Sequence, residues 1–234
     1  MVLSLPFRLC PSVRRAVIPA VAVWLCSAVS PALAHPHIFV ETGLRLEMDG
    51  AGHVVGIEVT WTYDELYSLL VLEDLELDDD YDGALRPDEI EKLSGFDLNW
   101  AAEFAGDLYL FPAAGADISP EDETGALALG APENRGARFS EGKITTVHYR
   151  AVPAQAAEGL RLRAYDPTFY TAYEVSGRVD APAPCRGLVN KPDLERAYAE
   201  VERRLGGRSA EVDDYPEVGA FFAETLVISC DPAS

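Results

Sequence analysis

Basic residues, histidine and cysteine are all scarce in this sequence. Lysine and arginine together number 19 against 39 aspartate and glutamate residues, and the chain has only four histidines and four cysteines. The formal net charge is −20 at pH 7. A surface of this charge repels nucleic acid and anionic lipid and concentrates cations. We therefore expect metal ions rather than nucleic acid among the partners.

The motifs of several large enzyme classes are also missing. The chain has no G-x-S-x-G, no C-x-x-C, no H-E-x-x-H and no glycine-rich loop that could hold a phosphate. The many acidic residues offer accidental carboxylate pairs, but no spacing singles out one pair as a general acid and base. We predict that the protein is not an enzyme.

A targeting segment occupies the first 34 residues. Arg8, Arg14 and Arg15 form a positive region, and residues 16–29 are apolar over a length typical of a signal peptide and too short to span a bilayer comfortably. Residues 32–34 form an A-x-A cleavage site. The sequence therefore predicts a signal peptide over residues 1–34, which is removed on export.

Cleavage after this segment defines the mature protein. It begins at His35 and is predicted to be a single periplasmic domain over residues 35–234. Cys26 follows the bulky Leu25, so we expect no lipid anchor. The segment contains three arginines and no acidic residue, which leaves 16 basic against 39 acidic residues and a net charge of −23.

Two cysteines remain in the mature chain, Cys185 and Cys230. In an oxidising compartment this pair predicts one disulfide. It closes a loop of about 45 residues and contributes about 4 kcal/mol in the chain-entropy description. The alternative is a pair of thiolates that act as soft metal ligands.

An acidic stretch from Asp78 to Glu89 follows the EF-hand calcium-loop pattern D-x-D-x-D-G-x5-E without a gap. Calcium takes about six to eight oxygen ligands, and this spacing supplies them in order. The expected ligands are the side chains of Asp78, Asp80, Asp82 and Glu89 and the backbone carbonyl of Ala84. Arg86, at position 9, cannot serve as a ligand. The alternative is an acidic loop without a metal.

Helical patterns flank this loop. Residues 64–72 are typical of an entering helix with Asp64 near its N-cap, and Pro87 suits the first position of an exiting helix. The sequence thus predicts an EF-hand-like helix-loop-helix insertion at about residues 64–100. EF-hands usually work as pairs and this loop is single, so we expect weak affinity, ~10⁻⁴–10⁻³ M.

The remaining pattern is that of strands with one late helix. Residues 44–63 form a predicted hairpin around the turn at 49–52, and residues 107–134 are less regular. Further strands are expected at 138–152, 160–164, 169–175 and 225–230, a helix at 193–205 and a short helical turn at 218–223. The predicted fold class is α+β: an antiparallel β-sheet or sandwich with the EF-hand-like insertion and a C-terminal helix.

Histidines at the mature N-terminus form a second candidate metal site. His35 offers its α-amine and imidazole, and His37 adds a second imidazole; such nitrogen ligands suit zinc, nickel, cobalt or copper. Pro36 has no N–H, so a square-planar site built on backbone amides is excluded. The alternative is an extended polar segment before the first strand. His148 is interpreted as a solvent-facing strand residue, and His53, which follows a turn, as a residue without a role in a site.

Several stretches together resemble one family. They are residues 34–40, 61–67, 165–170, the acidic loop and the late cysteine pair. The chain resembles the domain of unknown function 1007 family, described as a periplasmic component of uncharacterised ABC-type transport systems and often found beside nickel/cobalt-type permeases. The resemblance implies an accessory role in zinc, nickel or cobalt transport with a membrane permease as partner. It implies His35 and His37 as ligands, completed by carboxylates such as Asp166 or by a partner's residues.

Three hypotheses follow. The first is a periplasmic metal-binding accessory protein of a transition-metal transport system, with calcium in the acidic loop. The second is a calcium-stabilised interaction module without a transition-metal role. The third is an enzyme that uses a copper site at the N-terminal histidine.

Overall fold

A computed structural model describes residues 36–101, 104–113, 125–175, 179–206 and 216–231. The chain divides into two units, Met1–Leu33 and Ala34–Ser234, and all described residues belong to the second. The predicted signal peptide and His35 lie outside the described residues.

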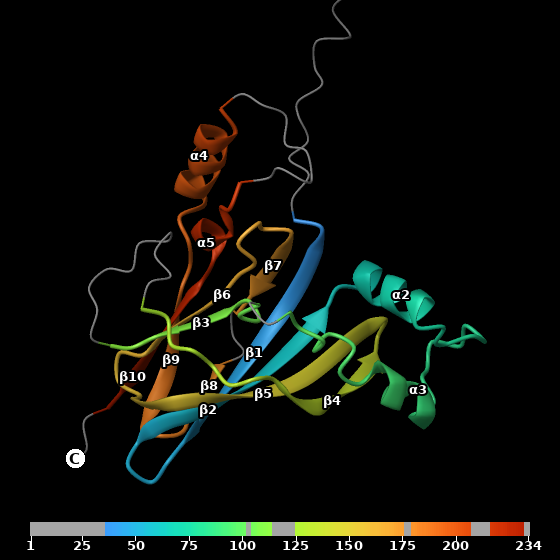
Figure 1. Cartoon of the computed structure of the whole chain (residues 1–234), viewed down its shortest axis with the longest axis horizontal. Coiled ribbons are helices and arrows are strands. Elements are labelled where there is room, and N and C mark those ends of the chain that lie inside the picture. The colour runs from blue at the N-terminus through green and yellow to red at the C-terminus, as the bar shows by residue number, and fades with distance from the viewer. Residues whose placement is uncertain (1–35, 102–103, 114–124, 176–178, 207–215, 232–234) are drawn as a thin grey trace, which may run out of the picture. The chain divides into compact units, whose positions relative to one another are not determined.

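The strands of the described residues form two sheets (Figure 1). The six-stranded sheet has the order β4-β5-β2-β1-β7, with β8 also paired to β1, and the four-stranded sheet has the order β3-β6-β10-β9. The six strands of the larger sheet are β1 (Ile38–Met48), β2 (His53–Tyr63), β4 (Glu133–Ser140), β5 (Lys143–Ala156), β7 (Thr171–Glu174) and β8 (Val179–Asp180). The four of the smaller sheet are β3 (Leu108–Phe111), β6 (Arg161–Ala164), β9 (Cys185–Asn190) and β10 (Thr225–Cys230).

The predicted first hairpin is confirmed. β1 and β2 pair antiparallel, with Leu44 opposite Val59 and Leu46 opposite Ile57. Their apolar side chains alternate toward the core, as the period-2 pattern requires. Asp49 forms the turn, because its Oδ1 accepts the N–H groups of Ala51 and His53 at 2.9 Å.

The larger sheet is mixed, whereas an antiparallel sheet was expected. β1 pairs in parallel with β7, where Ile38 lies opposite Thr171, and in parallel with β8, where Leu44 lies opposite Val179. Parallel neighbours need a long crossover, and here most of the chain separates the two partners. The alternation within each strand carries no information about a partner so far along the chain.

Several strand predictions need correction. The segment predicted as one strand from residue 138 to 152 is part of a hairpin of β4 and β5, which turns at Glu141 and Gly142, both with positive φ. β3 lies within the stretch interpreted as irregular, and β8 and β9 were not predicted. By contrast, β6 and β10 occupy the expected positions.

Four helices are described, and two of them enclose the acidic loop. These two are α2 (Glu65–Asp74) and α3 (Pro87–Leu93), which contact β5 and β4 respectively (Figure 1). The other two, α4 (Leu194–Leu205) and α5 (Gly219–Phe222), pack against each other. The predicted C-terminal helix is confirmed with its caps: Asp193 accepts the N–H of Arg196, and Gly206 ends the helix in the left-handed conformation.

One hydrophobic cluster joins the two sheets. It contains Leu44, Leu46 and Ile57 from the larger sheet and Leu110, Leu162 and Ile228 from the smaller. The fold is therefore α+β with two sheets that share a core.

The predicted disulfide is confirmed, and it links Cys185 and Cys230 across the pair β9–β10. Disulfides persist in oxidising compartments, so this bond indicates an extracytoplasmic location. No helix within the described residues has the length and apolar character needed to cross a membrane.

Candidate metal site

The acidic loop is held between two helices that are fixed to the larger sheet. Asp64 caps α2: its Oδ1 accepts the N–H of Tyr67 at 2.9 Å, and its Oδ2 accepts the N–H of Phe39 in β1 at 2.8 Å. Ser68 is fully buried, and its Oγ accepts the N–H of Ile144 in β5 at 2.9 Å. The start of α2 is therefore tied to two strands, which positions the loop that follows it.

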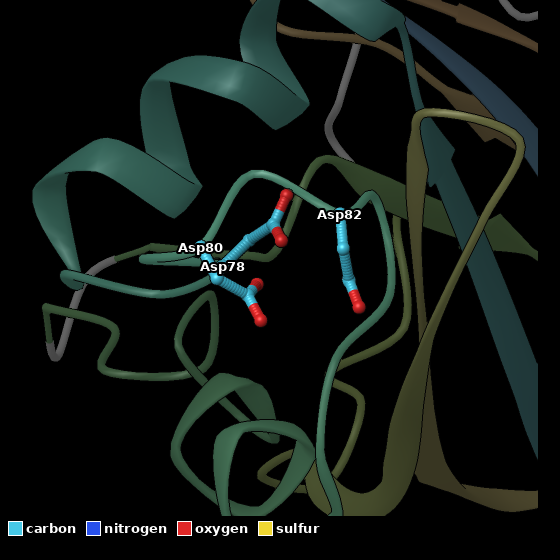
Figure 2. Close-up of side chains that lie close together, drawn as sticks. All are labelled: Asp78, Asp80 and Asp82. Atoms are coloured by element: carbon cyan, nitrogen blue, oxygen red, sulfur yellow. The ribbon is translucent and has the colours of Figure 1, made fainter.

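Three carboxylates of the loop converge. Asp78, Asp80 and Asp82 each place one oxygen within 4.8 Å of the others (Figure 2). Calcium–oxygen distances are about 2.3–2.6 Å, so two ligands of one ion lie at most about 5 Å apart. The group is solvent-accessible, with Asp80 and Asp82 exposed. It could hold a metal ion.

Backbone N–H groups orient these carboxylates. Asp78 Oδ1 accepts the N–H of Gly83 at 3.2 Å, and Asp82 Oδ1 accepts the N–H of Ala84 at 2.8 Å. Gly83 has φ +76°, a conformation that a residue with a Cβ rarely adopts. The turn that was predicted at Gly83 is therefore present, and it folds the loop back toward its first residue.

Glu89 does not join the three aspartates in this structure. Its side chain is buried, with the residue 1 % exposed; Oε2 accepts the N–H of Arg86 at 2.8 Å and Oε1 accepts the N–H of Asp78 at 3.2 Å. These bonds cap the first turn of α3 and connect it to the start of the loop. The expected full EF-hand set is thus represented by its three aspartates, while Glu89 and the Ala84 carbonyl remain predicted ligands.

Arg86 places a positive charge beside the site. Its guanidinium lies 2.8 Å from Glu89 Oε1, 3.3 Å from Asp79 Oδ1 and 3.8 Å from Asp88 Oδ1. The hydrogen bond to Asp79 is the main cause that raises the pKa of Arg86. The pattern excluded Arg86 as a ligand but did not reveal this ion-pair cluster. Of its three carboxylates only Glu89 is a predicted calcium ligand, so Arg86 competes with a bound cation at Glu89 and not at the three converging aspartates.

Of the two histidines predicted to form the N-terminal metal site, the structure describes only His37. This residue is exposed; its N–H donates to the carbonyl of Tyr170 at 2.9 Å, and its ring lies 4.8 Å from the Tyr170 ring. Asp166 serves turn geometry, because it accepts hydrogen bonds from Thr168 and Thr171. Among the described residues, no group of three metal-ligating side chains includes His37.

A cavity of about 390 Å³ lies near this segment, between β7 and the helices α4 and α5. Its wall includes the aromatic side chains Phe39, Tyr165, Phe169, Tyr173, Tyr198 and Phe222. His37 does not line it, and the wall also carries the charged residues Glu174, Lys191 and Glu224. The aromatic part of the wall suits an apolar group.

His148 was interpreted as solvent-facing, and this is wrong. It is 1 % exposed and packs its ring 4.6 Å from that of Trp61 and 5.6 Å from that of Trp100. Burial, reinforced by the nearby Arg150 charge, lowers the pKa of His148 to about 3. The even-numbered residues of β5 face inward because the segment around Asp97 and Trp100 covers them, a contact that strand alternation cannot reveal.

A polar network accompanies this buried histidine. Asp97 Oδ2 accepts the hydroxyls of Tyr63 at 2.8 Å and Thr146 at 2.6 Å. Burial and the Asp97 charge raise the pKa of Tyr63 well above its ordinary value, so the hydroxyl stays protonated and donates. The network fixes the segment that follows α3 onto the sheet.

Comparisons with known proteins give one family and remote structural likenesses. The family described as "Protein of unknown function (DUF1007)" matches residues 20–230. No curated protein matches the chain.

Two solved structures are similar to it over most of their length. Acetylcholine-binding protein type 1 of Biomphalaria glabrata is 16 % identical, covers 88 % of this chain and 91 % of its own, and has a TM-score of 0.30. The AChBP of Bulinus truncatus is 11 % identical, covers 90 % and 96 %, and has a TM-score of 0.28. Scores this low carry no conclusion about fold or function.

Proposed function

This chain belongs to the DUF1007 family, whose function is unknown, so we propose a function from the residues of the chain itself. We propose that it is a periplasmic protein that binds one calcium ion at the acidic loop. The supporting observation is the convergence of Asp78, Asp80 and Asp82 within 4.8 Å at EF-hand spacing. Calcium there relieves the repulsion among three like charges and links the end of α2 to α3.

Completion of the coordination sphere involves Ala84 and Glu89. The Ala84 carbonyl follows the turn at Gly83, and Glu89 Oε2 keeps a lone pair beside the Arg86 N–H that it accepts. The Arg86 guanidinium, 2.8 Å from Glu89 Oε1, opposes a second positive charge. We therefore propose weak affinity, ~10⁻⁴–10⁻³ M, which matches extracellular calcium modules.

Isothermal titration of the exported protein with calcium tests the proposal. Asp80→Asn with Asp82→Asn should abolish binding, whereas Asp74→Asn with Asp88→Asn removes the same charge outside the converging group and should retain it. Arg86→Gln should bind calcium several-fold more tightly, because the competing cation is gone. Equal calcium affinity in the wild type and in Asp80→Asn with Asp82→Asn contradicts the proposal.

We also propose an accessory role in transition-metal transport beside a membrane metal permease. Its support is the family resemblance together with the exposed imidazole of His37, which lies close to the predicted mature N-terminus. Zinc, nickel, cobalt or copper then binds through His35 and His37, and a partner supplies further ligands.

Native mass spectrometry of the signal-cleaved protein, titrated with zinc, nickel, cobalt and copper in turn, tests this role. One bound ion that disappears in the His35→Ala, His37→Ala variant supports it, and His53→Ala is the matched control. Unchanged uptake in the double variant leaves the calcium-stabilised interaction module as the better proposal. The absence of enzymatic activity stays a prediction.

A further inference from the structure

Helix α2 is apolar on two faces, and within the part of the chain that the structure describes only one of them is covered. Val71 and Leu72 are buried. Leu66, Leu69 and Leu70, at i, i+3 and i+4, are 64 %, 51 % and 53 % exposed. A helix that is apolar all round is normally covered all round, and an uncovered apolar face marks an interaction site. We call these three leucines the α2 face.

A cavity adjoins the α2 face at the C-terminal end of the helix. It has a volume of about 370 Å³, and Leu69 belongs both to its wall and to the α2 face. The other apolar wall residues are Leu72, Leu77 and Tyr81, and the acidic ones include Glu73, Glu76 and Asp79. The volume accommodates a large apolar side chain, and the carboxylates favour a cationic group beside it.

Charge selects the kind of partner. The whole chain carries −20, and the acidic loop follows directly after α2. An anionic lipid surface is repelled, and a second copy brings the same carboxylates against each other. A helix with apolar side chains on one face can pack against the leucines, and lysine or arginine beside that face can pair with the carboxylates.

We propose that the α2 face and its adjoining cavity dock a cationic amphipathic helix of a partner protein. The i, i+3, i+4 spacing of the three leucines forms a ridge that packs into the groove of a second helix. A bulky apolar residue of that helix enters the cavity, and its lysines or arginines lie against Glu73, Glu76 and Asp79. This docking goes beyond calcium binding, and the two sites adjoin, because Asp78 of the metal group also lines the cavity.

The probe is a fluorescein-labelled 18-residue peptide of leucine and lysine with one apolar helical face, measured by anisotropy in about 0.15 M salt with EDTA. A peptide of the same composition in scrambled order controls for attraction by charge alone. EDTA removes calcium, so a failure of calcium binding and a failure of docking give separate results.

The variant Leu66→Gln, Leu69→Gln, Leu70→Gln should weaken peptide binding at least tenfold without a change in charge. Leu188→Gln with Leu194→Gln is the matched control, because these leucines are 45 % and 53 % exposed on other elements, and it should bind within twofold of the wild type. Circular dichroism verifies folding; if the triple variant does not fold, Leu66→Gln and Leu70→Gln singly replace it.

Three results overturn the proposal. The first is equal peptide affinity in the wild type and the leucine variant, or equal affinity for the scrambled peptide. The second is self-association of the wild type in sedimentation that the leucine variant abolishes, since a second copy is then the occupant. The third is binding to phosphatidylglycerol vesicles that depends on the same leucines, which assigns the α2 face to lipid.

Discussion

Replacement of His148 by glutamine should flatten the pH dependence of stability below neutral pH. His148 is buried between Trp61 and Trp100, with Arg150 as the charged neighbour that further disfavours protonation, and its pKa is lowered to about 3. In the unfolded chain the ordinary value is about 6.5. Between these two values the unfolded state binds a proton that the folded state does not, so falling pH favours unfolding.

The magnitude follows from the two pKa values. Above pH 6.5 both states are neutral and His148 contributes no pH dependence. From pH 7 down to pH 4.5 it lowers the free energy of unfolding by about 2.5 kcal/mol, and the loss is complete near pH 3. Glutamine does not titrate, so the variant lacks this contribution, whatever its stability at pH 7.

Urea unfolding followed by fluorescence at half-unit steps from pH 7 to 4.5 measures the effect. The wild-type stability should fall more steeply than that of His148→Gln, with a difference that approaches about 2.5 kcal/mol at the acid end. Parallel curves for the wild type and His148→Gln refute the inferred burial of neutral His148.

Two further predictions concern stability. Cys185→Ser with Cys230→Ser opens a link across 45 residues and should lower the free energy of unfolding by about 4 kcal/mol in urea titrations; a loss below about 1 kcal/mol contradicts the entropic reasoning. Asp64→Ala removes the acceptor of the N–H groups of Tyr67 and Phe39 and should cost about 1–2 kcal/mol. Asp74→Ala, at the other end of α2, should change stability by less than about 0.5 kcal/mol, and equal losses in the two variants argue against the cap.

Local signals identified the parts of the fold that depend on neighbours in sequence. The cap at Asp193, the left-handed Gly206 and the apolar spacing between them define α4 without reference to the rest of the chain. The first hairpin could be predicted equally well, because Asp49 indicates the turn and the alternating residues around it indicate the two strands. The disulfide followed from the cysteine count and the compartment.

Contacts between segments far apart in the sequence could not be predicted from such local signals. The inward parity of β5 depends on Asp97 and Trp100, which lie far away in sequence. Neither β1 nor β7 has a sequence pattern that indicates their parallel pairing. At the candidate site, the aspartate spacing indicated the converging group, whereas Glu89 fits two patterns at once: position 12 of a calcium loop and the third residue of a capped helix. The sequence alone does not decide between those roles.

The two-sided pairing of β1 has a consequence for how the chain reaches its native state. One edge of β1 pairs with β2, which follows it directly in the chain. The other edge pairs with β7 and β8, which are synthesised much later. Until then an apolar strand has an open edge that can recruit another chain. Fragments that end before residue 171 should therefore aggregate, and the complete protein should fold slowly, at a rate set by this late closure.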